Sequence, residues 1–362
     1  MGRSVTGEVL GLPEWIVPIA AALTQLGDAW FLYLGLALLY WLADRRIAAN
    51  PRRVGATVVA VGLGALAVTV GFKSLFALPR PPGAGDATAP LWLPELLAGA
   101  YVNAATGDGF GFPSGHAIGA TMAYGALATF LDVGDRRTRR GVAALVIGVV
   151  ALTRVALGVH YLADVVVGVG VGLAGLWLFH RVARSGFRPN PDRAFFLAAT
   201  LGAVALLVAA AGGHGGEVLE AGTVVGGGLG GYAVWRVRGT DDAPVGLPGA
   251  AAGLAVIGVV FGGAYAVASA GLPYVFGVVP DTTPFRLLAV VPLSFAGVAL
   301  VVAWPTVVGR LRGPDADAPD DGSRREAEAD ADGDAVADLI SEAEAAVPEG
   351  VDADADGPDR SD

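Results

Sequence analysis

Nine apolar runs dominate the sequence, and most of them approach the length that a helix needs to cross a lipid bilayer. A crossing helix takes about 20 apolar residues. Because a backbone in hydrocarbon must satisfy its own hydrogen bonds, such runs favour helices. The sequence therefore predicts an all-α fold, a polytopic membrane helix bundle with about nine transmembrane helices. The runs cover residues 28–44, 54–72, 115–132, 142–157, 162–180, 194–212, 219–235, 249–270 and 286–309.

Arginines gather in every second loop between these runs. Cytoplasmic loops of membrane proteins collect Lys and Arg. The pattern predicts a multi-pass protein of the cell membrane with its N-terminus outside and its C-terminus in the cytoplasm. The loops in question hold Arg45, Arg46, Arg52, Arg53, Arg136, Arg137, Arg139, Arg140, Arg181, Arg184, Arg188, Arg193, Arg236, Arg238, Arg310 and Arg312.

Acidic residues concentrate at the C-terminal end. The chain carries a net charge of −10, and residues 314–362 alone contain 13 Asp, 5 Glu and 3 Arg. Such a segment has little to bury, so we expect a disordered acidic cytoplasmic tail. This acidic, lysine-poor composition resembles that of proteins from salt-loving microbes.

Four regions follow from these patterns. The stretch 9–27 contains Pro13, Glu14 and Pro18, so we expect it to lie at the membrane surface, with a tenth span as the alternative. We divide the chain into an N-terminal interfacial segment (1–27), a membrane core (28–185), an additional four-helix region (186–312) and the tail (313–362). The loop 82–112, which carries Trp92 and Tyr101, is either a lid or an interfacial anchor.

A first polar cluster contains the only lysine of the chain, Lys73, followed by Arg80 between Pro79 and Pro81. Lys73 comes where the second run leaves the membrane, and the prolines stop any further helix. An ammonium is a compact point charge, whereas a guanidinium is a planar fork. The oxygens of a phosphate group accept both kinds of donor. The alternative is a pair of cations that extend to the membrane edge.

A second cluster, Pro113-Ser114-Gly115-His116, comes just before the third run. Ser114 is a candidate N-cap, and a helix start offers N–H groups and a positive dipole to an anion. Gly115 allows close approach of a ligand, and His116 exchanges a proton near neutral pH. An ordinary capped helix with a chance histidine is the alternative.

A third cluster lies between the fourth and fifth runs and contains Arg154, His160 and Asp164. Gly158 allows a turn there, and His160 and Asp164, four residues apart, share one face of a helix. A carboxylate beside an imidazole fixes its tautomer, as a nucleophile or base requires. The alternative is a structural His–Asp pair, but ionisable groups at membrane depth usually serve a function.

All three clusters fall on the same, extracytoplasmic side by the arginine pattern. Their order is Lys-x6-Arg-Pro, then Pro-Ser-Gly-His, then Arg-x5-His-x3-Asp, and it closely resembles the three signature motifs of the type 2 phosphatidic acid phosphatase superfamily. The resemblance covers about residues 60–180. That family usually has Ser before the third-motif arginine, where this chain has Thr153. The nine-span layout resembles glucose-6-phosphatase, a family member, more than the six-span bacterial lipid phosphatases.

The resemblance implies a catalytic set and a phosphate-binding set. It implies that His160 forms a phosphohistidine, that Asp164 orients it, and that His116 protonates the leaving oxygen. It implies no metal and no cofactor. The chain has no cysteine and therefore no thiolate ligand. The implied phosphate-binding residues are Lys73, Arg80, Ser114, Gly115 and Arg154.

These observations predict a phosphoric ester or diphosphate hydrolase of the membrane. We expect a lipid or isoprenoid phosphate as substrate and the bilayer as partner, with no nucleic acid. Two alternatives are a transferase that moves a phospho-group or lipid headgroup through the same histidine, and a non-catalytic membrane transporter or binding protein on this scaffold. The sequence leaves the individual substrate and the oligomeric state open.

Overall fold

The computed structural model describes residues 15–185, 188–238, 245–270 and 283–312. The side chains of the third stretch are described up to Val260. Two compact units are separated, Met1–Gly309 and Arg310–Asp362. The start of the predicted interfacial segment and the predicted acidic tail lie outside the described residues.

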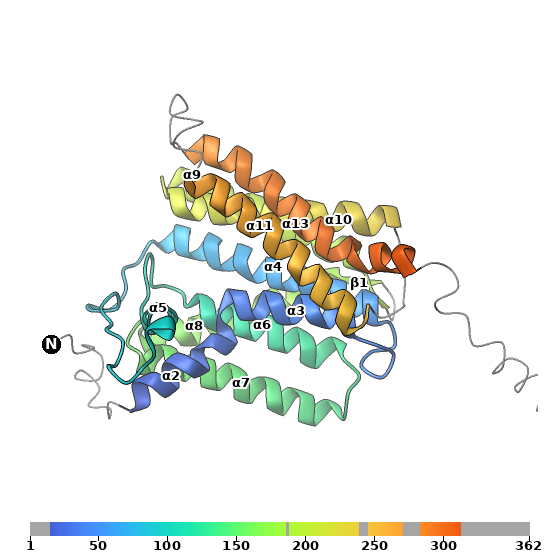
Figure 1. Ribbon diagram of the computed structural model, residues 1–362. Coiled ribbons are helices and arrows are strands. Elements are labelled where there is room, and N and C mark those ends of the chain that lie inside the picture. Colours follow the sequence, from blue (N-terminus) through green and yellow to red (C-terminus); the bar gives the residue numbers. More distant parts are fainter. Residues whose placement is uncertain (1–14, 186–187, 239–244, 271–282, 313–362) are drawn as a thin grey trace, which may run out of the picture. The chain divides into compact units, whose positions relative to one another are not determined.

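The described residues are almost entirely helical (Figure 1). A short antiparallel pair, β1 (Arg184–Ser185) with β2 (Arg188–Pro189), and the 3-10 turn η1 (Gln25–Gly27) are the other elements. The helices are α2 (Ile16–Thr24), α3 (Ala29–Leu42), α4 (Pro51–Phe76), α5 (Glu95–Ala105), α6 (Gly115–Phe130), α7 (Arg136–Ala156), α8 (Leu162–Val182), α9 (Pro191–Ala211), α10 (Gly215–Arg238), α11 (Gly246–Ala270) and α13 (Thr283–Arg312).

Each of the nine predicted ranges corresponds to one helix, from α3 to α13 without α5. By length and apolarity, four described helices are able to cross a membrane: α4, α8, α9 and α13. A fifth crossing is added if α2–η1 and α3, which meet at an angle of 46°, count as one broken span. Nine crossings therefore stays a prediction, because α6 has only 16 residues and α7 begins with a run of arginines.

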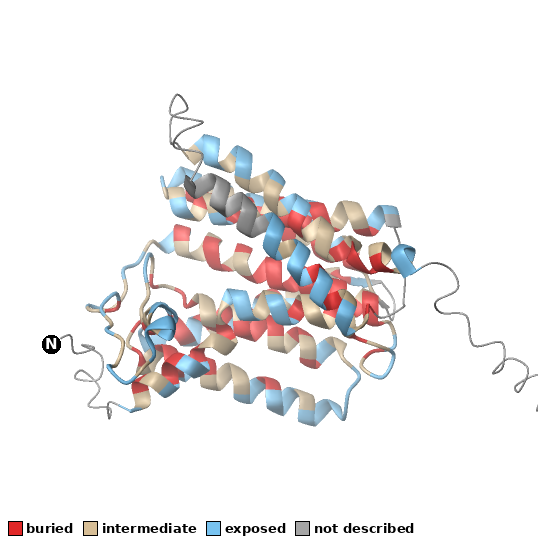
Figure 2. Ribbon diagram, in the orientation of Figure 1, coloured by how far each residue is buried: buried red, intermediate tan, exposed pale blue. Residues whose placement is uncertain are grey.

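Helix α4 lies in the middle of the bundle. It packs against α9 and α10 on one side and against α3, α6 and α8 on the other (Figure 1). Of the residues in the most apolar stretch of α4, 83% are buried. The corresponding shares of buried residues in α8, α9 and α13 are 33%, 39% and 17% (Figure 2). The outer helices instead expose large apolar side chains, among them Leu152, Trp177 and Leu207. Such surfaces suit contact with lipid rather than water.

Small residues bring the outer helices together. A Cβ added to Gly228 of α10 would lie 2.7 Å from the backbone nitrogen of Ala199 in α9. The two backbones therefore approach as closely as small residues allow in membrane helix pairs. Helix α3 is tied to α13 by side-chain bonds to backbone: Tyr40 donates to the carbonyl of Val302 at 2.8 Å and Trp41 to that of Val301 at 2.9 Å.

Local signals set the ends of α4. Pro51 stands at its first turn, where a missing N–H costs nothing. The helix continues one turn beyond Lys73 and ends at Ala77, which has a left-handed φ of 47° and donates to the carbonyl of Lys73 at 2.8 Å. Arg52, counted above among the loop arginines, is buried and donates to the carbonyls of Tyr40 and Trp41 at the end of α3.

The N-terminal segment lies against the same end of the bundle as the polar clusters. Val17 and Ala21 of α2 form an apolar cluster with Ala104 of α5 and with Val159, next to His160. Helix α5 lies inside the loop 82–112, where the sequence analysis predicted no helix. Part of the loop is thus a helix that packs against α2. The two interpretations of the loop, as a lid or as an interfacial anchor, both stay predictions.

Candidate active site

The three polar clusters meet at one end of the bundle. Lys73 comes from the last turn of α4, His116 from the first turn of α6 and Arg154 from the last turn of α7. Gly158, with a φ of 65°, turns the chain so that His160 precedes α8. A cavity of about 340 Å³ is lined by six of the predicted site residues, Lys73, Arg80, Gly115, His116, Arg154 and His160.

His160 is held between a cation and a carboxylate. The Nη1 of Arg80 lies 3.0 Å from its Nε2, and the Oδ2 of Asp164 lies 3.4 Å from its Nδ1. Because a guanidinium only donates, Nε2 is the accepting nitrogen and the proton belongs on Nδ1, toward Asp164. Asp164 is itself fixed by the backbone N–H of Tyr161 at 2.8 Å.

The surroundings of His160 favour its neutral form. The residue is 3% exposed. Burial, followed by the positive charges of Arg80, Arg154 and Lys73, lowers the pKa of His160 to about 2. A neutral imidazole with a lone pair on Nε2 is a nucleophile. Arg80 also donates to the carbonyls of Asp108 at 2.8 Å and Val159 at 3.1 Å, which fixes the guanidinium at the wall of the cavity.

The second cluster forms the start of α6. Ser114 is its N-cap, and its Oγ accepts from the N–H of Ala117 at 3.5 Å, so the predicted cap is confirmed. The N–H of Ser114 donates to the carbonyl of Asp164 at 3.0 Å, which joins the starts of α6 and α8. Ser114 is fully buried, and it and Asp164 do not line the cavity. Gly115 and His116 do.

Arg154 connects the cavity to the N-terminal segment and α5. It is 2% exposed, and its Nη1 donates to the Oγ1 of Thr24 at 3.1 Å and to the carbonyl of Ala104 at 3.3 Å. Thr153, which departs from the motif pattern, bonds the carbonyl of Val150 at 2.7 Å within its own helix. Its hydroxyl is thus engaged in the helix, and Thr153 is not among the residues that line the cavity.

Sequence reasoning missed several polar residues of the cavity wall, among them Asp28, Asn103, Asp108 and Glu220. Asp28 lies between η1 and α3, with its Oδ2 3.8 Å from the Nε2 of His116. Glu220 comes from α10, far along the chain from the motifs, and its charge acts on Lys73. Glu220 stands near the start of a predicted span, and an ionisable residue there was the signal that could have identified it.

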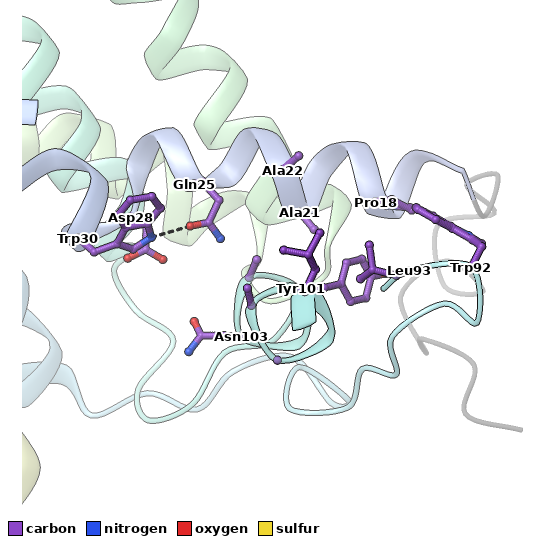
Figure 3. Close-up of a pocket in the computed structure, with 14 residues that line it drawn as sticks. Pro18, Ala21, Ala22, Gln25, Asp28, Trp30, Trp92, Leu93, Tyr101 and Asn103 are labelled. Carbon is purple, nitrogen blue, oxygen red and sulfur yellow. Dashed lines mark hydrogen bonds between the residues drawn. The ribbon is translucent and has the colours of Figure 1, made fainter. Parts of the chain in front are cut away.

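A second, apolar cavity adjoins the first. It has a volume of about 860 Å³ and runs between α2 and the segment 92–104 (Figure 3). Asp28 and Asn103 line both cavities. In Figure 3 these two residues lie toward one end of the groove, while Pro18 and Trp92 lie toward the other. The rest of its wall is mainly apolar, with Ala21, Ala22, Leu93, Leu97 and Tyr101.

One of the comparisons with known proteins gave a match, and the match covers the residues of this site. Among the described residues, no group of three or more His, Asp or Glu side chains is placed to hold a metal ion. Searches of curated proteins and of solved structures each gave no match to the chain. A family model, that of the PAP2 superfamily, matches residues 53–188, which include every residue of the three motifs. The match supports phosphatase activity on phosphate esters. Residues 53–188 are therefore the part of the chain that matches the PAP2 superfamily.

Proposed function

We propose that the protein is an integral membrane phosphatase that hydrolyses the phosphomonoester or diphosphate of a lipid or isoprenoid. One observation carries the proposal: the cationic cavity with the two histidines continues into an apolar groove, with Asp28 and Asn103 in both walls. A phosphate group fits the first cavity and a hydrocarbon tail fits the second. A sugar phosphate has no apolar part that would fill the groove.

The first cavity binds the phosphoryl group through its cations. Lys73 and Arg154 approach from α4 and α7, and Arg80 faces them from the loop after α4. Preorganised donors of this kind stabilise the charge that develops on the oxygens of phosphorus. In the described state Arg80 occupies the lone pair of His160 Nε2. The bound phosphate therefore has to draw Arg80 onto its own oxygens before His160 can react.

Phosphoryl transfer then proceeds in two balanced steps. The Nε2 of His160 forms a bond to phosphorus while the bond from phosphorus to the leaving oxygen breaks, and that oxygen takes a proton from His116. A water molecule next attacks phosphorus and gives a proton back to His116, while the P–N bond breaks. Asp164 holds the Nδ1 proton throughout and stabilises the imidazolium character of the intermediate. Inorganic phosphate is one product, and the other is the alcohol from a phosphomonoester or the monophosphate from a diphosphate.

The groove is suited to a hydrocarbon chain by size and by position. Its volume of about 860 Å³ lies within the range of sites that enclose most of a small amphiphile. Trp30 and Trp92 line it and are 57% and 70% exposed. Tryptophan prefers the boundary between hydrocarbon and water. The groove thus offers a lipid tail a path from the membrane boundary to the phosphate cavity.

A substrate panel tests the proposal. The purified protein in detergent is given long-chain lipid phosphates, an isoprenyl phosphate, a short-chain alkyl phosphate and a sugar phosphate, and the release of inorganic phosphate is measured. We expect kcat/KM to be highest for the long chains. An equal or higher kcat/KM for the sugar phosphate would contradict the lipid assignment. Transfer of the phosphoryl group to an added alcohol, without phosphate release, would favour the transferase alternative.

Gly99 offers a matched pair of variants for the groove. It lies on α5 in the groove wall, and a Cβ added there meets no atom within 4 Å. Gly99→Phe should fill the groove and lower kcat/KM for long chains about tenfold or more, comparable to the loss of a few buried methylenes. Gly99→Ala is the control, since alanine favours the helix and leaves the groove open. Equal losses for short and long substrates would show that the tail lies elsewhere.

We further propose that the site faces the outside of the cell membrane and that the chain crosses it nine times. Helix α4 begins with Arg52 and Arg53 and ends near Lys73, and α7 begins with Arg136 and ends near Arg154. The arginine-rich loops thus lie at the opposite end from the cavity, as expected of a cytoplasmic face. The chain lacks cysteine. A cysteine placed at Ala87 should react with an impermeant thiol reagent in intact cells, and one at Thr138 should not; the reverse would place the site inside.

A further inference from the structure

The geometry points to Asp28 as a positioning residue that keeps His116 protonated for its role as the acid toward the leaving oxygen. Asp28 lies outside the segment that matches the family model. The inference rests on the proposed function. It adds a residue from the start of α3 to the chemistry of the three motifs.

The backbone frees the Asp28 carboxylate for this role. Asp28 is the N-cap residue of α3, with extended dihedrals of −75° and 145°, yet its side chain makes no capping bond. An N-cap aspartate ordinarily accepts from the N–H groups of the first turn. At the start of α7, Asp135 does so with Arg137 and Thr138, both at 2.9 Å. The Asp28 carboxylate instead lies beside His116, with 3.8 Å between Oδ2 and Nε2.

The imidazole of His116, like the Asp28 side chain, lacks a hydrogen bond that its position would lead one to expect. Its Nε2 is buried and, within the part of the chain that is described, has no hydrogen-bond partner. The 3.8 Å to Asp28 is too long for a hydrogen bond, so the carboxylate acts on the imidazolium by charge. The Nε2 proton therefore stays available to the substrate.

The charges around His116 make such a partner necessary. Burial, followed by positive charges that include those of Arg154, Lys73 and Arg80, opposes the imidazolium form that a general acid requires. The carboxylate of Asp28 lies beside His116 and can form an ion pair with it when the imidazole is protonated. Its charge also acts on Arg154. The titratable and charged groups that line the cavity with His116 are Asp28, Tyr33, Lys73, Arg80, Asp108, Arg154, His160 and Glu220.

Three contacts hold the segment that carries Asp28. Thr24 accepts from Arg154 at 3.1 Å, and Leu26 accepts from the hydroxyl of Tyr124 at 2.7 Å. Across the bend, Trp30 donates to Gln25 at 2.7 Å (Figure 3). Two of these contacts reach α6 and α7, the helices of His116 and Arg154. The carboxylate is thus fixed relative to the imidazole.

The position of Asp28 also matches the position of the leaving oxygen. That oxygen joins the phosphoryl group to the tail, so it must lie where the two cavities meet. Asp28 lines both cavities, and His116 lines the phosphate cavity next to it. During cleavage the bond from phosphorus to that oxygen breaks and the Nε2 proton moves to the oxygen. His116 becomes neutral and later regains a proton from the attacking water.

Asp28→Asn tests the inference, because asparagine keeps the shape and the N-cap preference while it removes the charge. General acids contribute about 10²–10⁴-fold to rates. For an alkyl phosphate, whose leaving group needs a proton, we expect kcat to fall about 10- to 100-fold. For p-nitrophenyl phosphate, whose leaving group needs none, the loss should be at least about tenfold smaller. The basic limb of the pH profile of kcat for the alkyl phosphate should move to lower pH.

Two controls separate this role from a structural one. Asp135→Asn makes the same change at the N-cap of α7, at the far end of the helix from Arg154, and should leave kcat unchanged. On a His116→Gln background, Asp28→Asn should cost no further activity, because a residue that acts through His116 has nothing left to act on. Equal losses for both substrates, or a full additional loss on the His116→Gln background, would overturn the inference.

A measurement without turnover distinguishes failure of the inference from failure of the proposed function. In ¹⁵N-histidine spectra of the detergent-solubilised protein, the His116 signal is assigned by its disappearance in His116→Gln. At pH 6.5 the fraction of imidazolium at His116 should be clearly smaller in Asp28→Asn than in the parent protein. An equal fraction would overturn the pairing even if the enzyme is active. If the protein hydrolyses none of the substrates, the proposed function fails, and this spectrum still decides whether Asp28 sustains the charge of His116.

Discussion

The segment that matches the family model and the segments on either side of it differ in the charged groups that they supply to one cavity. Residues 53–188 contribute the cations and histidines, among them Lys73, Arg154 and His160, together with one carboxylate, Asp108. The flanking segments contribute carboxylates, Asp28 before the match and Glu220 after it. The match therefore identifies the residues that bind and attack phosphorus. The flanks add carboxylates to the cavity wall, to which the three motifs contribute none.

The two parts also differ in what they offer the substrate. Helix α4, inside the matched segment, is the most buried of the apolar helices and carries Lys73 at its end. Helix α2, outside it, supplies one wall of the apolar groove. We infer that the matched segment determines the reaction, whereas the N-terminal flank contributes to the choice of tail and leaving group. This division predicts larger losses of activity from changes to catalytic residues in the matched segment than from changes in the C-terminal flank.

The largest effect should come from the nucleophile inside the matched segment. His160→Ala should lower phosphate release by about 10³-fold or more, as expected when a covalent catalyst is removed. His180→Gln is the control, because His180 lies at the other end of α8 and its Nε2 is 3.1 Å from Arg184. Phosphate release from radiolabelled substrate is the measurement. Substantial activity in His160→Ala would show that the matched segment does not carry the reaction.

The helices were largely predictable from the sequence, because a membrane helix is encoded locally. All nine apolar ranges are helices, and the end of α4 lies within one turn of the predicted position. Helix α5 was not predicted: it has 11 residues and is too short to register as an apolar run. Its position depends on packing against α2. Such contacts are set by tertiary structure and leave no periodic signal.

The candidate site was predictable only in part, because some of its residues reach the cavity through tertiary contacts alone. Motif spacing identified the cations and histidines that meet at the cavity. Asp28 and Glu220 are single carboxylates without a motif, and they reach the cavity because distant helices fold back onto α4 and α6. Arg52 shows the converse, since a residue counted by sequence as a loop cation is buried against the end of α3.

An intermediate effect should come from Lys73, the only lysine of the chain. Lys73→Arg keeps the charge but replaces a compact ammonium with a planar fork, and the cavity already holds the guanidiniums of Arg80 and Arg154. We expect kcat/KM to fall about 10- to 100-fold, the range for a misplaced catalytic contact. Arg46→Lys, at the opposite end of the bundle, is the control. Full activity in Lys73→Arg would mean that charge alone suffices in the matched segment.

The smallest effect should come from the C-terminal flank. Glu220 faces the cavity from α10, and its negative charge acts on Lys73 and opposes a bound phosphate. Glu220→Gln should therefore tighten product inhibition by inorganic phosphate about three- to tenfold, which corresponds to about 0.6–1.4 kcal/mol for a charge in a partly solvated site. Glu95→Gln removes the same charge from the start of α5, outside both cavities, and should leave the inhibition constant unchanged. If Glu220→Gln instead weakens phosphate binding, Glu220 serves to position Lys73 rather than to repel the product. The C-terminal flank would then belong to the phosphate-binding machinery, and the division between the matched segment and its flanks would fail on that side.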